Sequence, residues 1–248
     1  MTGANRSTRW GQLIIDALVA AGVELAIVAP GSRSTPLVVA ATAHPQIETE
    51  SLLDERGAAF AALGHAKRTG DPAAVICTSG TAGGNMLPAV IEAHADPTPL
   101  VVCTADRPPS LHGTGANQTI EQAGLFAPYV RDRGTTPMPV ADAAVVAATA
   151  TAVAELVAAA RGPIAGPVHL NVPLAKPLAP TEPDASSQAQ RAVIAHPTGV
   201  ERPRPADAAV DRSALGRVAA ERAGEMATVE VGQTPAEVVY EENKLELL

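Results

Sequence analysis

Polar residues that can carry chemistry gather in four short clusters in the first half of the chain. The first cluster covers residues 30–36 (PGSRSTP). Gly31 permits a tight turn, the hydroxyls and amides can open a helix around an anion, and Arg33 offers a planar fork for a carboxylate. A strand-to-helix turn without any ligand can have the same composition. This cluster alone therefore leaves a binding role and a structural role open.

Two further clusters cover residues 54–60 (DERGAAF) and 78–85 (TSGTAGGN). An acidic residue in the first turn of a helix is favourable to the helix dipole. We expect this ordinary role for Asp54, and it would also suffice for Glu55 considered alone. In residues 78–85, small side chains let the backbone approach a ligand and leave its amides available. This cluster lacks the Gly-Lys-Ser/Thr ending of a phosphate-binding P-loop, so it is not that nucleotide motif.

The fourth cluster covers residues 104–109 (TADRPP) and continues into residues 115–120 (GANQTI). Two prolines make its loop rigid and leave Arg107, Asn117 and Gln118 as projecting donors. A rigid loop that carries Arg beside side-chain amides suits a substrate with several carboxylates. The run GTGANQ is not a dinucleotide fingerprint, because it has Gln where the third Gly belongs.

An alternation of strand and helix patterns would position these clusters. Strand patterns cover residues 25–29, 47–51, 73–77, 100–104 and 167–172. The first helix pattern runs from a cap at Ser7 or Thr8 to Ala21, and Gly22 is placed as its left-handed stop. Further helix patterns cover residues 35–43, 54–68, 81–95 and 142–160, and Pro88 interrupts the third of these. The alternation predicts an α/β fold, a doubly wound and mostly parallel sheet with helices on both faces. Right-handed crossovers bring the carboxyl ends of the strands to one edge, where such sheets bind ligands.

The sequence changes in character after residue 173. We divide the chain into a domain of residues 1–175, a Pro/Ala-rich linker of residues 176–210, and a charged tail of residues 211–248. The tail is expected to be partly helical and not part of the domain.

The composition narrows the class of protein. The net charge is −8, the isoelectric point is near 5.2, and there is no basic run, so we expect no nucleic-acid partner. Cys77 and Cys103 lie in apolar runs, which predicts small buried side chains in a reducing compartment. The six histidines show no metal-ligand spacing, and we expect structural or surface roles for all of them. There is no signal-peptide pattern and no apolar stretch long enough and free enough of charge to span a bilayer, so the expectation is a cytoplasmic protein.

A family resemblance joins the four clusters. The ordered set SRSTPL, DERGAAF, TSGTAGGN, ADRPP and GANQTIEQ, in this spacing, resembles the SEPHCHC synthases (2-succinyl-5-enolpyruvyl-6-hydroxy-3-cyclohexene-1-carboxylate synthases) of menaquinone biosynthesis, from Thr8 to Pro173. A Glu after the second strand and a Gly/Thr-rich loop after the next are general to thiamine-diphosphate enzymes. SRSTPL and GANQ are the specific parts. The resemblance implies the N-terminal pyrimidine-binding domain of such an enzyme.

The resemblance also implies a reaction and a set of roles. The enzyme would be a transferase that decarboxylates 2-oxoglutarate and adds the product to isochorismate, with thiamine diphosphate as the electron sink. Glu55 matches the catalytic glutamate that hydrogen-bonds the aminopyrimidine ring. Gly80 and Thr81 match the loop against that ring. The positions that match substrate-binding residues are Ser32, Arg33, Arg107, Asn117 and Gln118. The family is expected to form homo-oligomers.

The resemblance covers only one of the expected domains. Mg²⁺ and the diphosphate should be held by a Gly-Asp-Gly motif and a downstream Asn in a later domain, and no Gly-Asp-Gly occurs in this sequence. We therefore expect no metal ligand in this chain, and a truncated protein that is inactive alone. Two alternatives stay open. The chain could be the pyrimidine-domain subunit of a split thiamine-diphosphate 2-oxoacid decarboxylase, or a non-catalytic remnant that only binds a partner.

The tail carries a second resemblance. Residues 211–248, and above all VGQTP at 231–235 and VVYEENKLELL at 238–248, are similar to the N-terminal region of class III polyhydroxyalkanoate synthases. This match includes no catalytic residue and does not imply polyester synthesis. A gene fusion or rearrangement would explain it, and an unrelated charged tail is the alternative.

Overall fold

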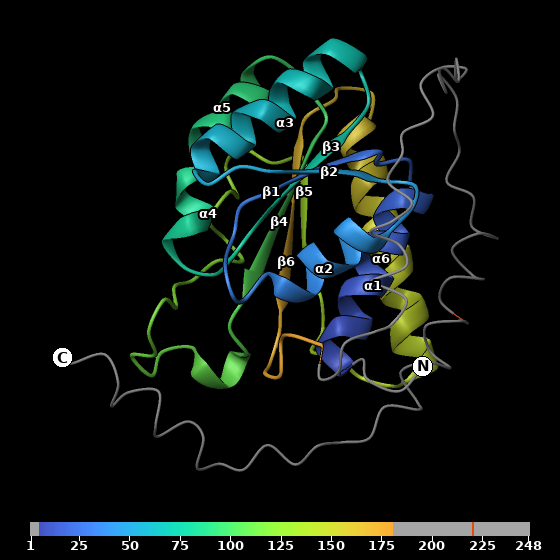
Figure 1. Cartoon of the computed structure of the whole chain (residues 1–248). Coiled ribbons are helices and arrows are strands. Elements are labelled where there is room, and N and C mark those ends of the chain that lie inside the picture. Colours follow the sequence, from blue (N-terminus) through green and yellow to red (C-terminus); the bar gives the residue numbers. More distant parts are fainter. Residues whose placement is uncertain (1–4, 181–219, 221–248) are drawn as a thin grey trace.

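Six parallel strands form a single sheet in the computed structural model, which describes residues 5–180 and Ala220 (Figure 1). Across the sheet the strands are β2 (Glu48–Ser51), β1 (Leu25–Val28), β3 (Ala73–Cys77), β4 (Leu100–Asp106), β6 (Pro167–Pro173) and β5 (Asp132–Thr135). Every neighbouring pair among them is parallel. The predicted doubly wound α/β fold is therefore confirmed.

The four inner strands and the two edge strands differ in sequence. The inner strands are apolar runs with every residue buried, as expected where helices cover both faces of a sheet. The edge strands β2 (ETES) and β5 (DRGT) are polar and largely exposed. Strand β5 was not predicted, because a strand of four mostly polar residues has no hydrophobic signal in the sequence. Pairing with β6 defines it, with Arg131 N donating to Pro167 O at 2.7 Å and Thr136 N to Asn171 O at 3.0 Å.

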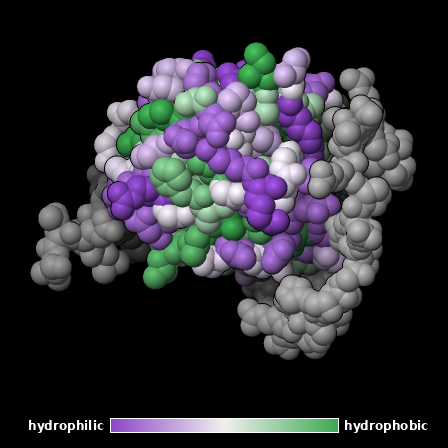
Figure 2. All heavy atoms as spheres, turned by 90° about the horizontal axis from the view of Figure 1, so that it is seen from above, coloured by the Kyte–Doolittle hydropathy of each residue, from purple (hydrophilic) through white to green (hydrophobic). Residues whose placement is uncertain are grey.

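Helices cover the sheet in two layers (Figure 1). One layer consists of α1 (Arg6–Ala20), α2 (Thr35–Ala43) and α6 (Ala143–Arg161). The other consists of α3 (Glu55–Thr69), α4 (Thr81–Asn85) and α5 (Leu87–Ala95). The cores on the two faces are separate clusters of mostly Ala, Val, Leu and Ile side chains. Seen from above, polar and apolar side chains are interspersed over the outer surface (Figure 2).

Most helix ends follow their predicted signals, with one correction. Asn5 caps α1 in place of Ser7 or Thr8, because Asn5 Oδ1 accepts from Thr8 N at 3.0 Å. The Ser7 hydroxyl instead donates to Ala175 O at 2.6 Å, a contact across 168 residues that sequence cannot reveal. Gly22 has φ +86°, as its predicted role as a stop requires. The predicted break near Pro88 lies at Met86, between α4 and α5.

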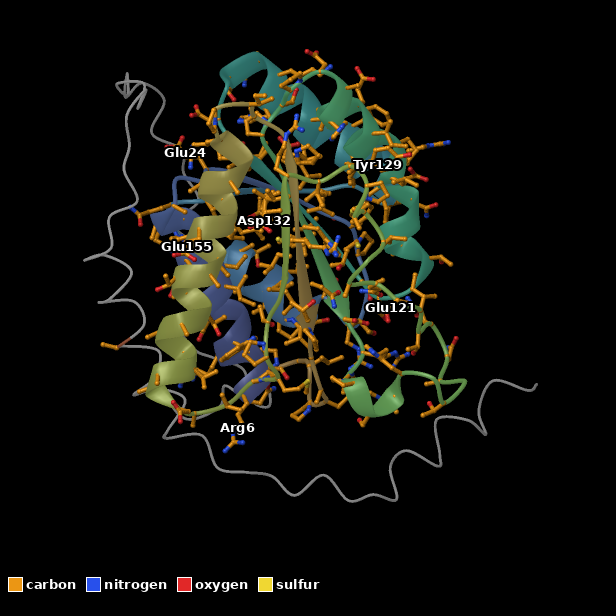
Figure 3. The ribbon with its side chains drawn as sticks, turned by 180° about the vertical axis from the view of Figure 1, so that it is seen from behind. Arg6, Glu24, Glu121, Tyr129, Asp132 and Glu155 are labelled. Atoms are coloured by element: carbon orange, nitrogen blue, oxygen red, sulfur yellow. The ribbon has the colours of Figure 1, made fainter. Side chains whose placement is uncertain are left out.

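Helix α6 corrects the expectation about apolar stretches. Ala143–Arg161 is long and apolar enough to cross a membrane by length and composition alone. In the structure, side chains such as Val146, Val153 and Val157 are buried in the core against the sheet. Glu155 lies on the side of α6 away from the strands (Figure 3). The packing is that of a core helix.

The segment that follows β6 packs against the domain. Leu174 is fully buried, and Asn5 Nδ2 donates to Ala179 O at 2.7 Å. Apart from Ala220, the predicted tail lies outside the described residues, as does most of the predicted linker, so both stay predictions. Cys77 and Cys103 are buried free thiols, as predicted. Burial raises the pKa of Cys103 to about 12, which makes a reactive thiolate unfavourable there.

Candidate functional site

The four polar clusters meet at the carboxyl edge of the sheet, and the loop and short helix after β3 (residues 78–85) contact the other three. Thr78 lies against the loop that follows β1, Asn85 contacts Glu55 after β2, and Ser79 is bonded from the loop after β4. The strand order places β3 between β1 and β4, which explains why its loop is central. We call residues 78–85 the hub loop.

The first cluster packs tightly on the hub loop. A Cβ atom at Gly31 would overlap the Thr78 side chain, and Arg33 N donates to Thr78 Oγ1 at 3.2 Å. Ser32 is exposed. Arg33 is only 5% exposed, and its Nη1 donates to Leu174 O at 2.8 Å. In this arrangement Arg33 holds the segment after β6 against the site, so its predicted role toward a substrate carboxylate remains a prediction.

Glu55 is the first residue of α3 and lies beside the far end of the hub loop. Asp54 caps the helix, its Oδ1 accepting from Gly57 N at 2.9 Å, which confirms the ordinary role expected for it. Glu55 Oε2 accepts from Asn85 Nδ2 at 3.0 Å. Burial, and secondarily the negative charge of Glu55, raises the pKa of the Cys77 thiol at the end of β3. The Glu55 carboxylate is thus near the strand end and still partly accessible to solvent.

Gly80 adopts a conformation that only glycine accommodates easily, with φ +81° and ψ −139°. A Cβ atom there would lie 2.8 Å from Gln118 Cγ. Gln118 Nε2 donates to Ser79 O at 3.0 Å, so the fourth cluster closes over the hub loop. Thr81, the first residue of α4, is exposed beside it. The predicted cofactor loop and one predicted substrate residue are therefore in direct contact.

A buried carboxylate organises the loop after β4. Asp106 is 1% exposed, and its Oδ1 accepts from Arg107 N at 2.7 Å. Its Oδ2 accepts from Asn171 Nδ2 at 2.9 Å and lies 3.6 Å from His112 Nε2. Within residues 5–180, the Nε of Arg107 is buried and has no hydrogen-bond partner. Such an unsatisfied donor suits a site that is completed by an anionic ligand. Asn117 is exposed in the same loop region.

Asn171 connects Asp106 to a neutral histidine. Its Oδ1 accepts from Thr104 Oγ1 at 2.9 Å, and Thr104 Oγ1 lies 2.7 Å from His169 Nε2. Since the single Thr104 proton is donated to Asn171, both contacts are hydrogen bonds only if His169 carries its proton on Nε2. Burial, and secondarily the charge of Arg133, lowers the pKa of His169 to about 4. The ring is therefore neutral at pH 7 and packs edge-on against Phe126.

Sequence reasoning missed four polar residues of this region. Asn85, Asp106 and Gln122 stand inside motifs that were singled out, but nothing in the sequence says which distant groups their side chains bind. Asn171 had a signal of its own, because it is polar in a strand that is otherwise mostly apolar (PVHLNVP). No group of three or more His, Cys, Asp or Glu side chains in the part of the chain that the structure describes is arranged to hold a metal ion.

Comparisons with known proteins show which sequences this chain resembles. Residues 8–125 match the family model for the thiamine pyrophosphate enzyme N-terminal TPP binding domain. Over 180 residues the chain is 54% identical to the 2-succinyl-5-enolpyruvyl-6-hydroxy-3-cyclohexene-1-carboxylate synthase of Natronomonas pharaonis and 53% identical to that of Halobacterium salinarum, covering 73% of this chain and 31% of each relative. The synthase of Salinibacter ruber is 48% identical over 197 residues, which are 79% of this chain and 33% of the relative. The chain thus spans about a third of the length of these relatives.

Proposed function

We propose that this chain supplies the pyrimidine side of the active site of a SEPHCHC synthase. The match of residues 8–125 to the family model of the thiamine pyrophosphate enzyme N-terminal TPP binding domain supports the proposal. The whole reaction would be the decarboxylation of 2-oxoglutarate and the addition of the product to isochorismate. The synthase would act in the cytoplasm as a homo-oligomer. Mg²⁺ and the diphosphate would be held by residues outside this sequence.

The observation that carries the proposal is the position of Glu55. Its carboxylate lies at the carboxyl edge of the sheet, is bonded by Asn85 of the hub loop, and remains partly exposed. A residue that served only the helix dipole would need no such partner, and Asp54 already fills the capping role. The Asn85 bond fixes the orientation of the carboxylate without removing it from reach of a ligand.

The residues present fit the pyrimidine part of thiamine diphosphate. Glu55 supplies a carboxylate for a ring nitrogen. Gly80 has no side chain, so its backbone could lie directly against the ring. When bound, the cofactor supplies an electron sink for decarboxylation. Glu55 would hold and return a proton at the ring nitrogen, and Asn85 would keep its carboxylate oriented. Gly80 and Thr81 would lie against the ring.

The substrate would be bound by residues of the first and fourth clusters. Arg107 is the best-supported member, because its Nε is buried without a partner among the described residues. A carboxylate that reaches the accessible part of the Arg107 guanidinium would gain a charge-assisted hydrogen bond. Ser32, Asn117 and Gln118 would add hydroxyl and amide contacts. Arg33 would contact the substrate from its position next to Leu174, whose carbonyl oxygen accepts a hydrogen bond from Arg33 Nη1.

A chimera tests the proposal directly. Residues 1–175 of this chain would replace the matching segment of the Natronomonas pharaonis synthase, and turnover of 2-oxoglutarate with isochorismate would be measured with thiamine diphosphate and Mg²⁺. We expect turnover that requires both substrates. A folded chimera without turnover, beside an active parent enzyme, would contradict the proposal. Release of carbon dioxide without consumption of isochorismate would instead favour a 2-oxoacid decarboxylase.

Cofactor binding by the 248-residue chain tests whether the pyrimidine side of the site is enough to hold thiamine diphosphate. We expect no tight binding of thiamine diphosphate, because the diphosphate contacts lie outside this sequence. Titration calorimetry with the cofactor and Mg²⁺ is the measurement. Saturable binding with a Kd of about 1 μM, which corresponds to about 8 kcal/mol, would show that the pyrimidine side suffices and would refute this part of the proposal.

A further inference from the structure

Two glutamines four residues apart hold the two polar atoms of one peptide group. Gln118 Nε2 donates to Ser79 O at 3.0 Å, and Gln122 Oε1 accepts from Gly80 N at 2.6 Å. The carbonyl and the amide of the Ser79–Gly80 peptide bond are thus both bonded to side chains of the loop between β4 and β5. We call this arrangement the peptide clamp.

The orientation of the Gln122 amide is determined by its surroundings. Gln122 is 1% exposed, and its Nε2 donates to Ala105 O at 3.2 Å and to Asn171 Oδ1 at 3.1 Å. A flipped amide would face these two acceptors with its own oxygen and would face the Gly80 N–H with its NH₂ group. None of these three contacts could then be a hydrogen bond. Oε1 must therefore face Gly80.

The clamped peptide is one that could otherwise rotate. Gly80 lacks a Cβ and has φ +81°, so its backbone has more accessible conformations than any other residue type would have. A buried amide and a carbonyl with good partners cannot turn without leaving both unsatisfied, which is costly away from water. The clamp therefore selects one orientation of the peptide in the hub loop.

The same side chain connects the hub loop to the loop after β4. Gln122 bonds Asn171, Asn171 bonds Asp106, and Asp106 accepts from the amide of Arg107. All three side chains of this path are buried to 2% exposure or less. Buried and mutually satisfied networks of this kind are rigid. Gly80 and Arg107 are therefore held in a fixed relation by side chains that are themselves out of reach of a ligand.

We propose that Gln122 is a positioning residue that sets the backbone of the hub loop at Ser79–Gly80 and links it, through Asn171 and Asp106, to the loop that carries Arg107. The proposal deepens the proposed function and rests on it, since Gly80 matters for catalysis only if it lies against the cofactor. Gln122 touches neither cofactor nor substrate. It acts through the peptide clamp.

The clamp itself is tested in the 248-residue chain by NMR. Gln122→Met keeps the length of the side chain and removes its hydrogen bonds. We expect a changed chemical shift of the Gly80 amide and hydrogen exchange that is about tenfold faster or more, as for a buried amide that loses its acceptor. Glu121→Gln is the matched control, because Glu121 precedes Gln122 in the same loop and is exposed (Figure 3). An unchanged Gly80 amide in folded Gln122→Met would overturn the clamp.

A conservative variant separates the two functions of the side chain and covers the case in which Gln122→Met does not fold. Gln122→Glu keeps an acceptor for the Gly80 amide but has no donor for Asn171 when ionised. We expect the Gly80 amide to stay protected while the shift of the Arg107 amide changes. Loss of protection at Gly80 with no change at Arg107 would contradict the proposed linkage.

The role toward the cofactor is tested in the chimera by calorimetry. We expect Gln122→Met to weaken binding of thiamine diphosphate by about tenfold or more, and Glu121→Gln to leave it unchanged, since misplacement of a site by a fraction of an ångström is costly. A changed Gly80 amide with unaltered cofactor affinity would overturn the positioning role and leave the proposed function intact. A chimera that binds no cofactor before any substitution would refute the proposed function, while the NMR result would still decide whether the clamp exists.

Discussion

The two ends of the candidate site are built differently. At one end, Glu55 and Asn85 form a single side-chain hydrogen bond at the surface. At the other end, Gln122, Asn171 and Asp106 are buried and form a connected network that reaches three strand ends. Both ends contact the hub loop. One end presents a charged group to solvent. At the other end, the polar side chains form hydrogen bonds with the backbone and with each other.

Under the proposed function, the difference separates groups that would meet a ligand from groups that hold the loops. An exposed pair contributes little to stability, because water competes for both partners. A buried network contributes more, and removing one member leaves its partners unsatisfied. Substitutions at the Glu55 end should therefore change chemistry with little effect on folding, and substitutions at the Asn171 end should do the reverse. Four predictions test this comparison.

The largest effect is expected for Glu55→Gln in the chimera. Gln can still accept a hydrogen bond from Asn85 but cannot hold a proton for the cofactor ring, so turnover should fall by about 10²–10⁴-fold. The melting temperature should stay near that of the parent chimera. Steady-state turnover of 2-oxoglutarate with isochorismate is the measurement, and Arg107→Ala is the comparison, expected to raise KM more than it lowers kcat. Near-normal turnover of a folded Glu55→Gln chimera would return Glu55 to a purely structural role.

Asn171→Leu should destabilise the chain by about 3 kcal/mol. The substitution keeps the volume but removes the hydrogen bond that Asn171 donates to the buried Asp106 Oδ2 and those that it accepts from the Thr104 hydroxyl and from Gln122 Nε2. Urea unfolding monitored by circular dichroism gives the free energy. Asn85→Ala is the matched change at the exposed end and should cost less than about 1 kcal/mol. Equal losses for the two variants would remove the basis of the comparison.

The stability of the protein should depend on His169 between pH 6.5 and about 4. The pKa of His169 is lowered from 6.5 to about 4 in the folded state, so below pH 6.5 the unfolded chain binds the proton first. The folding stability that comes from the neutral His169 ring is fully present above pH 6.5. It is lost as the pH falls toward 4, by at most about 3 kcal/mol. Unfolding free energies of the natural chain and of His169→Gln, measured across this range, should diverge. Parallel curves would show that the ring is not held neutral.

The smallest effect is expected for Asp54→Ala, at about 1 kcal/mol of unfolding free energy. Asp54 caps α3 beside Glu55, and its Oδ1 accepts from Gly57 N within the same helix. Asp142→Ala removes an equivalent cap from α6, where the carboxylate accepts from Ala144 N and Val145 N, and should cost a similar amount. Cofactor affinity of the chimera should change in neither variant. Lost affinity in Asp54→Ala alone would place Asp54 in the site.

Local signals in the sequence predicted much of the architecture. Helix α2 has its predicted bounds, and the left-handed glycine at Gly70 ends α3 where the pattern stops. The apolar run of β3 also has its predicted bounds. These features depend on residues within a few positions of one another, so the sequence alone suffices to predict them. The motifs at the strand ends are local in the same sense.

The relations between motifs could not be predicted in this way. Gly80 and Gln122 are 42 residues apart, and Asn171 and Asp106 are 65 apart. Their contacts depend on the strand order, which places β3, β4 and β6 side by side. Strand β5 exists because β6 offers it a partner, and α6 is a core helix because the sheet covers its apolar side.

The sequence by itself thus determined most of the elements of this protein, β5 excepted, and the residue types that stand at their ends. Only the tertiary structure decided which of those residues remain accessible to solvent and which bind one another. The physical reason is that a polar side chain has the same propensity in either role. Burial, and the partners that the fold places within hydrogen-bonding distance, distinguish the partly exposed carboxylate of Glu55 from the buried carboxylate of Asp106.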